Sequence, residues 1–153
     1  ALVKKFLAGG RVLDVGFGFG AAASFLLSLG ASIVSIDPDR QALELGLEEL
    51  RGYGERLSLV EARAEELPFR DRAFDASVSV MAAHHFSDVA KALREMARTA
   101  RRIALLIDYD GSGPAPHSPD FLRRRAEAAL AEGERLGFRA GRGRGLYYLV
   151  LEL

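Results

Sequence analysis

The 153-residue chain carries 21 basic and 21 acidic side chains, so its formal charge is zero, and it contains no cysteine. This balance gives nucleic acid binding no electrostatic support, and the lack of cysteine excludes disulfides and thiolate metal sites. No apolar run is long enough to span a bilayer, and no signal-peptide pattern opens the chain. We therefore expect one domain, residues 1–153, in a cytoplasmic protein without a membrane partner.

Strand-like and helix-like segments alternate along the chain with short connections, which is the pattern of a mostly parallel sheet. In chain order, the expected elements are a helix 2–8, strand 11–15, helix 21–29, strand 32–36, helix 39–51, strand 57–61, strand 74–80, helix 88–100, strand 102–108, helix 119–136 and strands 138–140 and 146–153. The last two strands flank a glycine-rich turn and are close enough to form an antiparallel hairpin. The predicted fold is α/β, with a doubly wound, mostly parallel seven-stranded sheet that ends in an antiparallel hairpin strand.

The first strand runs into three glycines at every second position, Gly16, Gly18 and Gly20, and a helix of small apolar residues follows. Glycine adopts positive φ and has no Cβ, so a ligand can approach the backbone of this turn closely. A strand, a glycine turn and a helix in this order form the nucleotide-binding corner of a doubly wound sheet.

Two carboxylates narrow the choice of nucleotide. Asp37 ends the second strand, where it is placed to accept both hydroxyls of a ribose; its alternative role is to cap the following helix. Asp14 precedes the turn, where it would oppose a pyrophosphate but favour a cationic ligand, unless it hydrogen-bonds the loop backbone instead. The glycines alone also fit a dinucleotide template through Ala21, whereas S-adenosylmethionine is cationic and has no phosphate.

Four blocks then appear in a recognisable order: D-x-G-x-G-x-G (14–20), Asp37, E-E-L-P-F-R-D-R-A-F-D (65–75) and S-V-M-A-A-H-H-F (79–86). Together they resemble the S-adenosylmethionine-dependent class I methyltransferases, most closely the ubiquinone/menaquinone-biosynthesis type, over nearly the whole chain. The resemblance implies a Rossmann-like methyltransferase fold and transfer of a methyl group from S-adenosyl-L-methionine, with S-adenosyl-L-homocysteine as the product.

The resemblance also implies roles for individual residues. The glycine loop would lie against the methionine portion, Asp37 would hold the ribose, and Pro38 would pack on the adenine. The family usually has an Asp where this chain has Arg63, which cannot accept a hydrogen bond, so the backbone of Ala64 and the carboxylate of Glu65 or Glu61 are the candidates left for the adenine. The implied cofactor-binding set is Asp14, Gly16, Phe17, Gly18, Gly20, Asp37, Pro38, Ala64, Glu65 and Met81. Phe17 and Phe19 would either press on the ligand or fold into the core.

His84 and His85 follow the fourth strand, at the edge where ligands bind in such sheets. Either is a candidate catalytic base for removing a proton from the methyl acceptor, and the alternative is that both pack or hydrogen-bond within the loop. Asp108 and Tyr109 would line a substrate pocket or simply end the fifth strand. No metal site is expected, because only His84 and His85 are neighbours in sequence and His117 falls in a proline-rich, solvated loop.

The sequence does not identify the methyl acceptor, which we expect to be a small molecule, a protein or an RNA. No segment suggests a lid, so we expect an open acceptor site, or one completed by a second subunit in a homodimer. The alternative function is a non-catalytic S-adenosylmethionine-binding module that acts as a partner or regulatory subunit. An NAD-dependent oxidoreductase is disfavoured by Asp14, the L-P-F block and the antiparallel ending.

Overall fold

The computed structural model describes residues 7–153 and contains a single seven-stranded sheet. Its strands are β1 (Arg11–Val15), β2 (Ser32–Asp37), β3 (Leu57–Glu61), β4 (Phe74–Val80), β5 (Ala100–Tyr109), β6 (Arg139–Gly143) and β7 (Leu146–Glu152). The helices are α2 (Ala21–Ser28), α3 (Arg40–Leu50), α4 (Val89–Thr99) and α5 (Pro119–Arg135), with 3₁₀ turns η1 (Arg51–Arg56) and η2 (Ala83–His85). The predicted fold class is confirmed.

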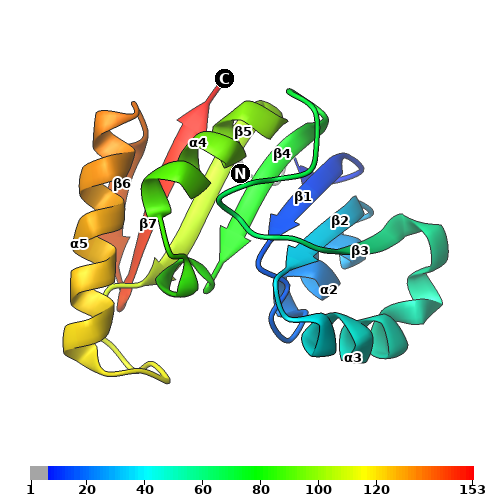
Figure 1. Ribbon diagram of the computed structural model, residues 1–153, viewed down its shortest axis with the longest axis horizontal. Helices are drawn as coiled ribbons and strands as arrows, with labels where there is room; N and C mark the ends of the chain where they lie inside the picture. The colour runs from blue at the N-terminus through cyan, green and yellow to red at the C-terminus, as the bar shows by residue number, and fades with distance from the viewer. Residues whose placement is uncertain (1–6) are drawn as a thin grey trace.

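The strand order β3-β2-β1-β4-β5-β7-β6 places the topological switch point between β1 and β4. The first five strands are parallel, and β7 runs antiparallel between β5 and β6. In Figure 1 the arrowheads of β1, β2 and β4 point to the lower edge of the view, and β7 points upward. The carboxyl ends of these five neighbouring parallel strands therefore meet at one edge, which is where ligands bind in such sheets.

The hairpin turn between β6 and β7 is shorter than the expected glycine-rich turn. Arg144 and Gly145 have φ values of 57° and 80°, so both residues are left-handed, as a two-residue type I′ turn requires. Consequently β6 begins at Arg139 and continues through Gly143, and the expected limits of 138–140 were wrong at both ends.

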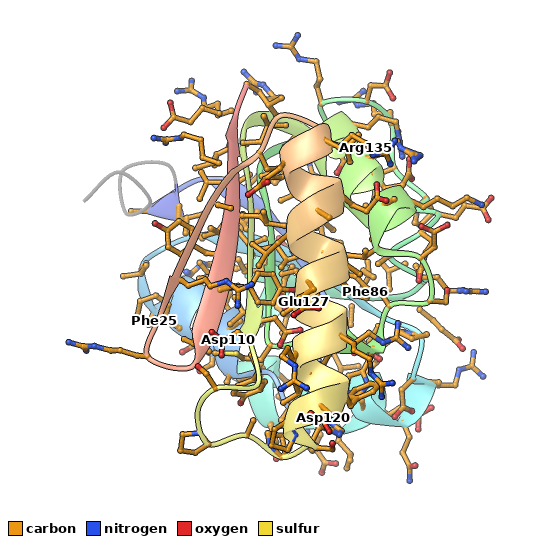
Figure 2. The ribbon with its side chains drawn as sticks, turned by 90° about the vertical axis from the view of Figure 1, so that its left-hand side faces the viewer. Phe25, Phe86, Asp110, Asp120, Glu127 and Arg135 are labelled. Carbon is orange, nitrogen blue, oxygen red and sulfur yellow. The ribbon has the colours of Figure 1, made fainter. Side chains whose placement is uncertain are left out.

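Helices cover both faces of the sheet. The core on one face includes residues of α2 and α3, and the core on the other includes residues of α4 and α5. Figure 2 shows α5 lying along the sheet from Asp120 at its lower end to Arg135 at its upper end. Within residues 7–153, no helix combines the length and apolar character that a membrane crossing needs.

Short polar side chains fix where the helices begin. Asp39 accepts hydrogen bonds from the backbone of α3, Asp88 caps α4, and Ser118 caps α5 with Pro119 in the first turn. The predicted helices 39–51 and 88–100 included these caps. Of the helix expected at 2–8, Leu7 is helical, and residues 2–6 lie outside the described part of the chain. The 3₁₀ turns η1 and η2 were not predicted.

Phe17 shows how tightly α3 packs on this sheet. Its ring is 3% exposed, and a Cβ added to Gly46 of α3 would lie 2.1 Å from the ring atom Cε1. We expect Gly46→Ala to reduce the free energy of unfolding by about 1–3 kcal/mol, because the added methyl overpacks the core. The matched control is Gly52→Ala, since a Cβ there would meet nothing within 4 Å. Urea unfolding measures both free energies, and equal stability of the two variants would contradict the close packing of Phe17 against Gly46.

Candidate functional site

The candidate site lies at the switch point, where the glycine loop after β1 meets the segment after β4. Gly16 of the loop lies directly against Ala82 of that segment: a Cβ added to Gly16 would lie 2.4 Å from that of Ala82. The loop is also tied to β2, because the backbone N–H groups of Gly16 and Phe17 both donate to the carbonyl of Ile36. Residues far apart in sequence are therefore held against one another at a fixed position.

Asp14 is a fully buried carboxyl group beneath this loop. Its Oδ2 accepts a hydrogen bond from the hydroxyl of Ser35 at 2.7 Å, whereas Oδ1 is buried and has no partner among the described residues. Burial raises the pKa of Asp14 to about 7; the hydroxyl of Ser35 partly opposes this rise, and the charge of Asp37 adds to it. A buried carboxyl oxygen without a donor fits a site whose missing partner is a hydrogen-bond donor or a cation.

Asp37 lies half-buried at the carboxyl end of β2, between the glycine loop and α3. Its Oδ2 accepts from the backbone N–H of Gly18 and its Oδ1 from that of Asp39, each at 2.9 Å. The alternative role in capping α3 is filled by Asp39 instead. Each oxygen of Asp37 keeps a second lone pair, so the carboxylate can still accept from two hydroxyl groups.

The residues of the glycine loop face two different environments: Gly18 and Phe19 are exposed, whereas the side chain of Phe17 is buried in the core. Gly18 has a φ of 55°, and a Cβ there would meet nothing within 4 Å, so the backbone is open to an approaching molecule. Phe19 is fully exposed beside it. The side chain of Phe17 is buried against Gly20 and Gly46, which is the core alternative expected for it, so only its backbone is available to a ligand.

The family model of a methyltransferase domain matches residues 13–107, from the middle of β1 to near the end of β5. The chain belongs to this methyltransferase family. The family predicted from the sequence blocks is therefore confirmed, and the matched residues contain the candidate site except Asp108, Tyr109 and the loop that follows β5.

Curated relatives agree with this assignment of the methyltransferase domain. An uncharacterized methyltransferase of Bacillus subtilis (strain 168) is 36% identical over 102 residues, covering 65% of this chain and 40% of that protein. A ubiquinone/menaquinone biosynthesis C-methyltransferase of Proteus mirabilis (strain HI4320) is 37% identical over 109 residues, covering 68% and 43%. The chain thus spans less than half the length of these relatives.

A solved structure supports the fold of the methyltransferase domain over almost the whole chain. It is a SAM-dependent methyltransferase from Aquifex aeolicus, with a TM-score of 0.80 and 22% sequence identity. The match covers 99% of this chain and 87% of that one. At this level of identity, the comparison bears on the arrangement of strands and helices.

The segment after β3 is built differently from what the family pattern implies. Arg63 donates to the hydroxyl of Ser87 at 2.8 Å, and Glu65 accepts from both the backbone and the hydroxyl of Ser87, each at 3.0 Å. Glu61 pairs with Arg40 at 3.3 Å. Both carboxylates proposed as substitutes for the missing Asp therefore already have protein partners. Ala64, which lies between Glu61 and Glu65 in the sequence, is buried.

His84 is held by a buried carboxylate. Its ring Nδ1 lies 2.9 Å from both oxygens of Asp108, and its backbone N–H donates to Asp108 Oδ2 at 2.7 Å. Both side chains are almost completely buried, at 3% and 1% exposed. This is the hydrogen-bonded alternative for His84, and Nε2 is the ring nitrogen left for another partner.

The ring of His85 is exposed and lies next to two other imidazoles. Its centroid is 4.1 Å from that of His84 and 5.3 Å from that of His117. Partial burial lowers the pKa of His85. The neighbouring rings of His84 and His117 lower it further, whereas the carboxylates of Asp108 and Asp37 raise it. Asp37 is therefore near enough to influence His85 electrostatically.

The structure places His117 beside His84 and His85, a contact that the sequence did not predict. Although the ring is exposed, the loop after β5 brings it to 4.8 Å from that of His84, measured between centroids. Spacing in the sequence gave no sign of this contact, because His117 lies 33 positions after His84. The sequence signal that pointed to this region was Asp108, expected at the end of the fifth strand, which contacts the ring of His84.

The remaining predicted residues lie around the glycine loop. Pro38 is exposed next to Asp37, and Gly20 begins α2 with a φ of 84°. Met81 is partly exposed, has a positive φ of 56° and donates its N–H to Ile107, so it turns the chain out of β4. A separate hollow of about 260 Å³ lies on the α5 side of η2, lined by residues that include Ala83, Phe86 and Arg125.

Proposed function

We propose that this domain binds S-adenosyl-L-methionine and transfers its methyl group to an acceptor. The observation that carries the proposal is the pair of carboxylates on either side of the glycine loop: Asp14 with a buried, unpartnered oxygen and Asp37 with two free lone pairs. Membership of the methyltransferase family supports the same reading. A ligand with hydroxyls at one end and positive charge at the other suits this arrangement.

In this proposal the residues keep the roles that the resemblance implied. Asp37 accepts the ribose hydroxyls, Pro38 packs on the adenine, and Ala64 offers its backbone at the adenine edge. The loop from Gly16 to Gly20 lies along the methionine portion, with Asp14 beneath it and Met81 opposite. When bound, the cofactor supplies an electrophilic methyl group on a sulfonium.

The protein's part in the reaction is mainly placement. Holding the acceptor atom in line with the methyl group removes most of the entropic cost of bringing the two reactants together, so the reaction does not need a strong acid or base. We propose His85 as the group that receives a proton from a hydroxyl or amine acceptor, since its ring is exposed beside the loop. His84 instead positions that segment through Asp108.

The acceptor and its surroundings are also proposals. The acceptor is a small molecule, a protein or an RNA, and we propose that the site is open in this single domain or is completed by a second copy or partner subunit. The exposed rings of His85 and His117 support an uncovered site. A cytoplasmic location stays a prediction from composition.

One observation favours a second function. Arg63 stands where the family has an Asp that binds adenine, and its side chain donates a hydrogen bond to the hydroxyl of Ser87. In that case the domain would bind the cofactor without transferring its methyl group and would act as a regulatory partner. Fold alone does not decide between the two.

Separate measurements of cofactor binding and of methyl transfer distinguish the methyltransferase from the non-catalytic module. With S-adenosylhomocysteine at 100 times its dissociation constant, we expect stabilisation by roughly 2.7 kcal/mol in thermal unfolding, and none with NAD. Labelled S-adenosylmethionine with fractionated cell extract then tests transfer. Binding without any labelled product identifies the non-catalytic module, and stabilisation by NAD alone contradicts both readings.

A further inference from the structure

The three histidines of the described chain gather at one place beside the proposed cofactor site. His84 and His85 come from η2 after β4, and His117 comes from the loop after β5. One possible ligand atom of each lies within 4.8 Å of those of the other two. From this geometry we propose that His84, His85 and His117 form a binding site for a divalent transition metal of the zinc class.

The chemistry of the donor set favours such an ion. Neutral imidazoles bind zinc, copper, nickel and iron(II), whereas calcium and magnesium prefer oxygen ligands. Three histidines leave a fourth tetrahedral position for water or another ligand, as in catalytic zinc sites. Zinc–nitrogen bonds of about 2.0–2.1 Å place tetrahedral ligand atoms roughly 3.4 Å apart, so distances of up to 4.8 Å in the cluster must shorten by up to about 1.4 Å.

The buried member of the cluster is already oriented for this role. Asp108 engages Nδ1 of His84 and so directs Nε2 of the same ring away from the carboxylate. A carboxylate behind a ligating histidine fixes its tautomer and strengthens it as a ligand, and it is a recurrent outer partner in metal sites. The carboxylate of Asp108, almost completely buried behind His84, adds negative charge next to the cluster and so favours a cation there.

The loop that carries His117 is anchored rather than loose. Asp110 accepts hydrogen bonds from the backbone and hydroxyl of Ser112, at 2.8 and 2.7 Å, and its own N–H donates to the carbonyl of Gly145. A Cβ added to Gly113 would lie 2.9 Å from the Cα of Gly145. The start of this loop is therefore held against the turn between β6 and β7, which lowers the entropic cost of assembling the ligands.

The site is distinct from methyl transfer, although it shares one side chain with it. A bound ion would occupy the lone pair of His85, so that side chain cannot be ligand and proton acceptor at the same time. Metal binding and cofactor binding are therefore expected to be separable properties.

Calorimetric titration of tag-free protein with zinc chloride tests the proposal. We expect one ion per chain for the unaltered protein and at least tenfold weaker binding for both His117→Ala and His85→Ala, whose side chains are exposed. Asp120→Asn is the matched control, because this exposed carboxylate lies three positions from His117 and is paired with Arg123; it should bind as the unaltered protein does.

Cobalt(II) gives a second readout that does not depend on affinity alone. Four-coordinate cobalt has an intense visible absorption, which we expect in the unaltered protein and Asp120→Asn and not in the two histidine variants. The proposal is overturned if no ion binds, or if the histidine variants bind with unchanged affinity and spectrum. S-adenosylhomocysteine binding measured on the same samples reports separately on the proposed function.

Discussion

Asp37→Ala is expected to weaken S-adenosylhomocysteine binding by roughly 30- to 1000-fold, as measured by calorimetry. The carboxylate at the end of β2 would form charged hydrogen bonds to two ribose hydroxyls, and losing them costs about 2–4 kcal/mol of binding free energy. It also holds the N–H of Gly18, so the loop loses an anchor at the same time.

Asp39→Ala is the control for this variant, because Asp39 is two residues away and caps α3. It should reduce the free energy of unfolding by about 1 kcal/mol and leave the dissociation constant nearly unchanged. The opposite pattern, with affinity lost in Asp39→Ala and kept in Asp37→Ala, would remove Asp37 from the site.

Asp14→Asn is expected to stabilise the protein relative to the unaltered chain, and to do so by about 3 kcal/mol more at about pH 8 than at about pH 5. Folding moves the pKa of Asp14 from 3.8 to about 7, so between these values the folded state holds a proton that the unfolded chain has lost. Stability therefore falls as pH rises through this window, by on the order of 4 kcal/mol. A neutral amide avoids that cost.

Urea unfolding of both proteins at the two pH values measures the effect. The comparison isolates Asp14, because the other titrating groups, Asp37 included, are common to both proteins. Ser35→Ala provides a second check: it removes the hydroxyl that favours the charged form, so the dependence on pH should become steeper. An equal difference between Asp14→Asn and the unaltered protein at both pH values would contradict a raised pKa.

The sheet was predictable because its signals are local. Apolar runs bounded by glycine, proline and polar residues placed β1, β3 and β4 at the residues where the structure has them. The glycine loop and the carboxylate of Asp37 follow from the same short-range pattern. Spacing in the sequence therefore contains enough information to place one edge of the site.

The other half of the site depends on contacts between distant segments. Nothing near Phe17 in sequence shows that Gly46 leaves room for its ring, and nothing near His84 shows that Asp108 and His117 surround it. The partners of Arg63 and Glu65 at Ser87 are equally remote. Such contacts arise only when neighbouring strand ends meet, which a single sequence does not specify.

The position of β7 has a consequence for the order in which the chain assembles. Because β7 pairs with both β5 and β6, one edge of β5 has no neighbour until residues 146–152 have left the ribosome. An unpaired edge strand attracts other chains, so the nascent chain is expected to be prone to aggregation until β7 has emerged. Gly145, directly before β7, makes the contacts that hold the start of the loop of His117, so this corner is completed together with β7.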